Sequence, residues 1–289
     1  MRDITGLEPR VLQGSIAVGL APGESAPLPA EGVVANINLA TVDFDAWETA
    51  LSKAAGVPLG TPVAPVGNVA SAQAYLPTVM AVRAAALTVS GRTFRNVVVG
   101  GGRDGLTWRA NVSADQLNGY AEYRQPSRAG AGRVYARLAH LTIAPATAAE
   151  VEAVLDQQPA AIPALDIVVE DFELRGRKLG RVEVEAINRG GGARPGEGGM
   201  REWRLNKFNI VVPEASFAAT GNWAAVDPAP GEPQGPQSAR PSVERRRTQM
   251  NFKLDIADSG ALLTRFGMKD VIRRGKGRLE GQVTWAGSP

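Results

Sequence analysis

Hydrophobic and polar residues alternate along much of this chain, and Gly, Pro and Asn separate the alternating runs. Alternation with a period of two places apolar side chains on one face of a β-strand and polar side chains on the other. The clearest runs lie in the stretch 165–223 and in the stretches 249–256 and 278–285. Earlier in the chain, the same pattern predicts strands at 10–20, 33–42, 80–90, 94–100, 105–112, 118–124 and 133–143.

One of these phrases occurs twice. Leu87–Val99 (LTVSGRTFRNVVV) aligns without a gap on Phe172–Val184 (FELRGRKLGRVEV). Gly91 then falls on Gly176 and Val97 on Val182, and further on Trp108-Arg109 corresponds to Trp203-Arg204. An internal repeat of this kind predicts a sheet built from similar units that stack on one another.

Few segments have helical spacing. A short helix is expected to start at Asp43–Trp47, capped by Asp43 or Asp45, and another helical or linking segment is expected at 146–156. A third helix is expected at 258–266, capped by Asp258 or Ser259 and followed by Gly267. Pro-rich stretches predict a linker at 57–77 and a disordered hairpin insertion at 227–241. We therefore predict three segments: the end of a β-repeat with a short helix and linker at 1–77, a β-repeat at 78–162, and a second β-repeat at 163–289.

The predicted fold is mostly β, an antiparallel sheet with two or three short helices. These helices are too short to cover the sheet, so something else must bury its apolar face. A second sheet, the same sheet curled on itself, or a ligand could each do so.

The composition offers little chemistry. The 289 residues include 32 basic and 29 acidic side chains, one His and no Cys, so thiolate metal sites and disulfides are excluded. No G-x-S-x-G motif accompanies His140, which we interpret as a structural or surface residue. Glu183 and Glu185 fall on the polar face of a strand, where solvation is a simpler role than acid–base catalysis. We expect no enzyme activity, no catalytic residue, no metal and no cofactor.

Two basic runs, Arg245–Arg247 and Arg273–Lys276, flank predicted turns. The simplest interpretation is that they are solvated strand ends. Alternatively they contact nucleic acid or another polyanion, although aromatic residues make up only 6% of the chain. A further hypothesis is contact with lipid phosphate or an anionic membrane surface.

Several phrases resemble a known family. LPALDIVVEDFELRGRKLGRVEVEA, WRLNKFNIVVPEASFAATGNW and the stretch from TQMNFKLDIADSGALLTRFG to the last residue are similar to the large YhdP-type members of the AsmA-like proteins. The resemblance is collinear over nearly the whole chain. It implies a long, curled antiparallel sheet, open along one side with an apolar concave face, in a protein that is anchored in the inner membrane and extends through the periplasm. The family's membrane helix is not recognisable here, and no segment reaches the ~18 consecutive apolar residues that a membrane helix needs. We therefore expect an internal piece of a longer protein.

The resemblance also implies a role in moving phospholipid between membranes. The expected partners are phospholipid and the membranes at the ends of the full-length protein, and we expect no nucleic acid. The residues expected to line a groove for acyl chains are Phe172, Leu174, Val182, Val184, Met250, Phe252, Leu254, Leu279, Val283 and Trp285. A closed β-sandwich that serves as a scaffold for protein assembly fits the alternation equally well.

Overall fold

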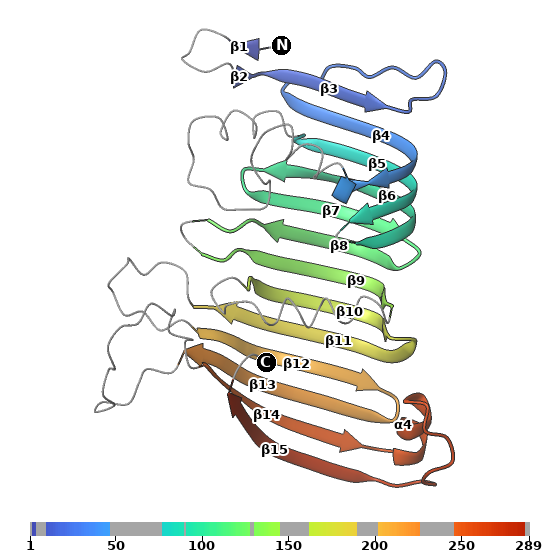
Figure 1. The fold of residues 1–289 in the computed structure, drawn as a ribbon, viewed down its shortest axis with the longest axis vertical. Helices are drawn as coiled ribbons and strands as arrows, with labels where there is room; N and C mark the ends of the chain where they lie inside the picture. The colour runs from blue at the N-terminus through green and yellow to red at the C-terminus, as the bar shows by residue number, and fades with distance from the viewer. Residues whose placement is uncertain are drawn as a thin grey trace, which may run out of the picture. The chain divides into compact units, whose positions relative to one another are not determined.

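The computed structural model describes residues 2–3, 10–46, 77–89, 91–127, 130–144, 162–189, 202–225 and 246–286. The chain divides into two compact units, which we call unit 1 (Met1–Glu122) and unit 2 (Tyr123–Pro289). Most of the described residues lie in strands, which confirms the prediction of a mostly β protein (Figure 1). Strands β3 to β15 belong to one open sheet in which each strand lies next to the strands before and after it in sequence.

Unit 1 contains a small pair of strands and the first part of the sheet. The pair is β1 (Arg2–Asp3) and β2 (Arg10–Val11). The sheet strands are β3 (Gln13–Val18), β4 (Gly32–Asp43), β5 (Val79–Val89), β6 (Arg92–Asp104) and β7 (Thr107–Ala114), and β8 (Leu117–Arg124) runs across the boundary between the units.

Unit 2 contains the remaining strands and, among its described residues, helix α4 (Ser259–Arg265). The strands are β9 (Arg133–Ile143), β10 (Ala164–Leu174), β11 (Arg177–Asn188), β12 (Glu202–Val212), β13 (Ala215–Ala225), β14 (Arg246–Ile256) and β15 (Gly277–Ala286). Helix α4 joins β14 to β15. One helical turn also follows β4, where the backbone N–H of Ala46 donates to the Asp43 carboxylate at 2.9 Å, as the capping pattern predicted. The expected helical segment at 146–156 and the insertion at 227–241 lie outside the described residues.

The sheet is not antiparallel throughout. β3 pairs with β4, β4 with β5, and β9 with β10 in the parallel direction, whereas the other described pairings are antiparallel. A parallel neighbour requires a connection long enough to bring the chain back to the side from which it started. The chain between β4 and β5 contains the Pro-rich stretch 57–77, which the sequence predicted as a linker, and the chain between β9 and β10 contains the predicted helical or linking segment 146–156. The predicted division into segments 1–77, 78–162 and 163–289 stays a prediction.

The repeated phrase forms the same local structure in both copies. β5 and β6 form a hairpin that turns at Gly91, and β10 and β11 form one that turns at Gly176. The φ angles of these glycines are 70° and 74°, in the left-handed region that tight hairpin turns require and that glycine enters without steric cost. Val97 and Val182 are both buried, and Trp108 and Trp203 lie opposite the equivalent positions Arg103 and Asn188. The internal repeat is therefore a repeat of structure.

Candidate functional site

The strands of unit 2 place apolar residues side by side across the sheet. Because facing residues of adjacent strands project to the same side, the strand register defines rows of neighbours. One row runs Val182, Ile210, Phe217, Leu254 and Leu279 from β11 to β15, and the next runs Val184, Phe208, Ala219, Phe252 and Gly281. A third runs Ala186, Leu205, Gly221, Met250 and Val283. We call these three rows the apolar face.

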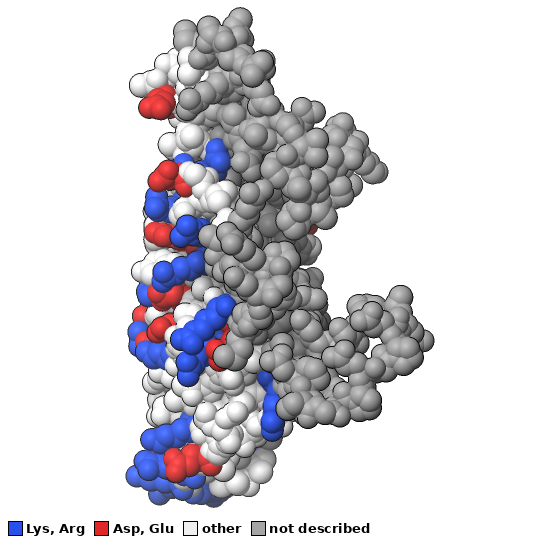
Figure 2. All heavy atoms as spheres, turned by 90° about the vertical axis from the view of Figure 1, so that its left-hand side faces the viewer, with Lys and Arg blue, Asp and Glu red and all other residues white. Residues whose placement is uncertain are grey.

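The opposite side of the same strands is polar, and several of its charged side chains form ion pairs. Glu183 accepts from Arg181 at 2.6 Å and also pairs with Lys207, while Asp255 pairs with Lys253 at 3.1 Å and with Arg278 at 2.6 Å. The hydrogen bond from Lys207 is the main reason that the pKa of Glu183 lies below its ordinary value, and the bond from Arg278 does the same for the pKa of Asp255. Figure 2 shows positive and negative side chains interleaved on the visible described surface. A face of this kind is satisfied in water and needs no further partner.

Aromatic rings meet at the centre of the apolar face. The rings of Phe208 and Phe217 pack edge to face with centroids 5.9 Å apart, and those of Phe217 and Phe252 stack at 6.4 Å. Aromatic contacts of this geometry add stability beyond the area they bury. These three side chains are only partly buried, so the rings give the face a firm apolar floor without closing it into a core.

A tryptophan cluster lies where the apolar face meets the start of β10. It consists of Ile162, Ala186, Trp203 and Trp223, and Trp223 has no solvent exposure. The indole N–H of Trp203 donates to the Pro163 carbonyl at 3.2 Å, and the Asn188 amide donates to the Ile162 carbonyl at 2.6 Å. The cluster is therefore a packed core that anchors the chain entering β10. The alternation alone had not distinguished it from the rest of the face.

Helix α4 is fixed to the opposite ends of these strands. Asp258 caps the helix by accepting from the backbone N–H of Ala261 at 3.0 Å, as predicted, and Gly267 follows with a φ of 87°. The Arg265 guanidinium donates to both carboxylate oxygens of Glu214, at 2.9 and 2.7 Å, and to the Lys178 carbonyl at 3.0 Å. The bond from Arg265 lowers the pKa of Glu214, although burial acts in the other direction. The helix is thus tied to the β12–β13 turn and to β11.

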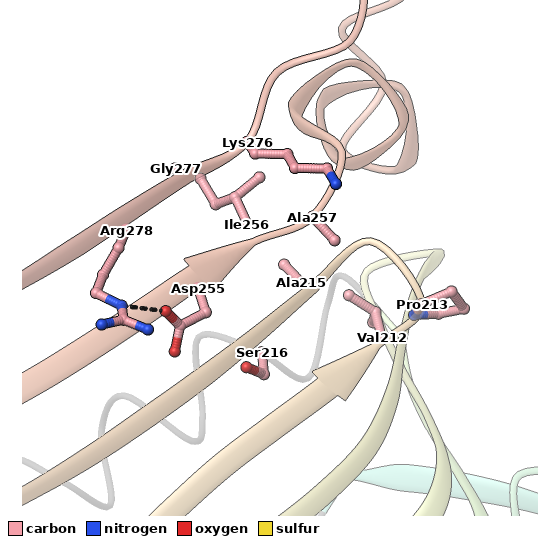
Figure 3. A pocket seen from close by; sticks show the side chains of 10 residues that line it. All are labelled: Val212, Pro213, Ala215, Ser216, Asp255, Ile256, Ala257, Lys276, Gly277 and Arg278. Carbon is pink, nitrogen blue, oxygen red and sulfur yellow. Dashed lines mark hydrogen bonds and ion pairs between the residues drawn. The ribbon is translucent and has the colours of Figure 1, made fainter.

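A pocket of about 640 Å³ opens beside this helix, where the β12–β13 turn meets the end of β14 and the start of β15 (Figure 3). Its apolar side chains are Val212, Pro213, Ala215, Ile256 and Ala257. Its polar lining comes from Ser216, Lys276 and the paired Asp255 and Arg278. An apolar floor and a cation therefore lie next to one another at this end of the sheet.

Seven of the ten predicted lining residues lie on the apolar face, in strands β11, β14 and β15, and an eighth lies next to it. Val182, Val184, Met250, Phe252, Leu254, Leu279 and Val283 belong to the apolar face, and Trp285 lies beyond it, opposite Thr248. Val182 is buried, whereas Leu279 and Val283 are 56% and 39% exposed. Phe172 and Leu174 lie past a register shift in the β10–β11 pairing, opposite Gly180 and Arg177 and outside the three rows, and their place in the lining stays a prediction. Phe208, Ile210 and Phe217 were missed, although β12 and β13 also show the alternation that would have identified them.

The residues weighed for catalysis are dispersed. His140 lies in β9 opposite Asp171 of β10, and Glu183 is engaged in the ion pairs of the polar face. Within the described parts of the chain, no three His, Asp or Glu side chains gather in a group that could hold a metal ion. The apolar face can exclude water from an apolar molecule.

Comparison with known protein families identifies the family of this chain. The family model described as YhdP protein matches residues 2–289. The chain belongs to the YhdP family. This membership points to a role related to lipid transport in the cell envelope and to a transport-type family rather than a family of enzymes. No match was found among curated proteins or among solved structures. None of the helices in the described part of this YhdP-family chain is long and apolar enough to cross a membrane.

Proposed function

We propose that this chain is a non-enzymatic segment of a conduit that carries phospholipid through the periplasm between the inner and outer membranes. The acyl chains would lie on the apolar face, and the headgroup would stay at its open side. In the full-length protein, an anchor in the inner membrane would hold this segment in the periplasm. Family membership supports the general role, and the continuity of the apolar rows across five strands supports the specific one.

The observation that carries the proposal is the incomplete burial of a large apolar surface. Phe208, Phe217, Phe252 and Leu254 are partly exposed in rows where a closed core would bury them, and Leu279 is 56% exposed. Each methylene group that leaves water gains about 0.8 kcal/mol. Two acyl chains laid along these rows would therefore gain enough to remain bound without any specific polar contact.

The direct test is to purify the chain and analyse its organic extract by mass spectrometry. The proposal expects co-purified phospholipid. In the variants Leu254→Asp and Val184→Asp, a carboxylate would keep water at the centre of the rows, so the lipid content should fall about tenfold or more. Each substitution removes the apolar contact of two or more lipid methylene groups, at about 0.8 kcal/mol for each methylene.

The matched control is Lys253→Glu, which adds negative charge one residue away on the opposite face of the same strand. It should leave the lipid content within about twofold of that of the unmodified chain. Equal losses from both faces would contradict the proposed groove. An extract without phospholipid would contradict the conduit and favour a scaffold for protein assembly.

A further inference from the structure

The connection between α4 and β15 exposes an unusual number of apolar side chains. Phe266, Met268, Val271 and Ile272 are 45%, 48%, 63% and 51% exposed, and all four fall within seven residues. Single exposed apolar residues are normal on a protein surface, but a cluster of them indicates a surface that another partner covers. We call the segment from Phe266 to Lys276 the basic-apolar loop.

The loop has a defined conformation. Its first turn is fixed by hydrogen bonds from the N–H groups of Gly267 and Met268 to the carbonyls of Thr264 and Leu263, at 2.9 and 2.8 Å. Its second half returns to the start of α4, where the N–H of Ser259 donates to the Gly275 carbonyl at 2.8 Å. A Cβ on Gly260 would lie 2.5 Å from the Ile272 carbonyl oxygen, so the backbone of the loop is packed against the helix. The apolar side chains are therefore presented to solvent by a held backbone.

Cations alternate with these apolar residues. The loop contains Lys269, Arg273, Arg274 and Lys276 against one carboxylate, Asp270, which gives it a net charge of +3. None of the four cations forms an ion pair with another described residue. Arg265 and Arg278, which lie just outside the loop, are by contrast paired with Glu214 and Asp255. The positive charge of the loop is thus available to an external partner.

We propose that the basic-apolar loop binds the surface of a bilayer that contains anionic phospholipid. At such a surface, aliphatic and aromatic side chains enter the layer between headgroups and acyl chains while neighbouring Lys and Arg residues meet lipid phosphate. A nucleic acid would neutralise the cations but would offer nothing to Val271 and Ile272. This surface is separate from the apolar face, and the inference does not depend on whether that face holds lipid.

The test is co-sedimentation of the whole chain with two sets of vesicles, one of phosphatidylcholine alone and one containing about 30% phosphatidylglycerol. We expect binding to the anionic vesicles, weak binding to the neutral ones, and a loss of binding in 0.5 M salt because salt screens the charges. Each cation near an anionic surface contributes about fivefold in affinity, so Arg273→Gln/Arg274→Gln should weaken binding about 25-fold. Val271→Ser/Ile272→Ser should weaken binding as well at low salt, where the unmodified chain is bound.

The matched control is Arg83→Gln/Arg124→Gln, which changes the net charge of the chain by the same amount at exposed positions elsewhere. It should bind as the unmodified chain does. Equal binding by the control and by Arg273→Gln/Arg274→Gln would overturn the proposal, and so would failure of the unmodified chain to bind anionic vesicles, as expected if the partner were an acidic protein. Circular dichroism of each variant establishes that it is folded.

Discussion

The contact between Arg265 and Glu214 allows a quantitative test of how α4 is held. The two side chains form a bidentate pair, and their exposed fractions are 22% and 17%. We consider Glu214→Gln, which removes the charge but keeps the size of the side chain. Hydrogen bonds between charged groups in partly buried positions contribute more than exposed surface pairs do. We expect the substitution to lower the free energy of unfolding of unit 2 at pH 7 by about 2 kcal/mol.

The effect should depend on pH in a definite direction. The pKa of Glu214 is lowered in the folded chain from an ordinary value of 4.5, chiefly by its bond to Arg265. A carboxylate whose pKa is lower when folded stabilises the protein above its unfolded pKa, and this stabilisation is lost as the pH falls through the folded pKa. The difference between the unmodified chain and Glu214→Gln should therefore be full at pH 7 and shrink below about pH 4.5. Glu183 and Asp255 titrate in both proteins, so their contributions cancel.

Urea denaturation followed by tryptophan fluorescence measures this difference, because three of the five tryptophans, Trp203, Trp223 and Trp285, lie in unit 2. Arg265→Gln and the double variant complete a double-mutant cycle, and the expected coupling energy at pH 7 is about 1–2 kcal/mol. A difference that stays constant from pH 7 to pH 3, or a coupling energy near zero, would refute this account of the pair.

Two further predictions concern packing. Trp223→Ala should lower the free energy of unfolding by about 3–5 kcal/mol because it removes a fully buried indole. Leu279→Ala, at a 56% exposed position of the apolar face, should lower it by less than about 1 kcal/mol. Similar losses for the two variants in urea denaturation would contradict the assignment of the tryptophan cluster as a core. Val97→Ala and Val182→Ala should each cost about 2 kcal/mol because they occupy equivalent buried positions of the repeat, whereas Val98→Ala, at a 47% exposed position, should be near neutral. Unequal costs for the two buried valines, measured by thermal denaturation, would mean that the two copies pack differently.

Much of the local structure could be predicted from the sequence. The alternation located the strands to within a few residues, as in β5, expected at 80–90 and found at Val79–Val89, and in β9, expected and found at 133–143. Asp43 and Asp258 were among the candidate caps, and the repeat identified Gly91 and Gly176, where the two hairpins turn, as equivalent positions. These features depend on a few neighbouring residues, because strand periodicity, helix capping and left-handed turns are local properties of the chain.

The candidate site was predicted less completely. The pattern placed Val184 and Leu254 on one face, as the strand register does. It did not show the register shift that separates Val169 from Phe172 in β10, because alternation within one strand does not report a bulge against its neighbour. For the basic-apolar loop, the sequence likewise identified the charges of Arg273 and Arg274 but did not predict the exposure of Val271 and Ile272.

The sequence by itself determined which residues alternate, where the chain turns and which phrase is repeated, because each of these follows from the chemistry of a short stretch. Only the tertiary structure decided that β9 and β10 run parallel, that Trp203 and Trp223 form a closed core, and that the neighbouring rings of Phe208 and Phe217 remain partly exposed. These outcomes depend on which strands become neighbours and in what register. Pairing between residues far apart in sequence fixes both, and no single stretch contains that information.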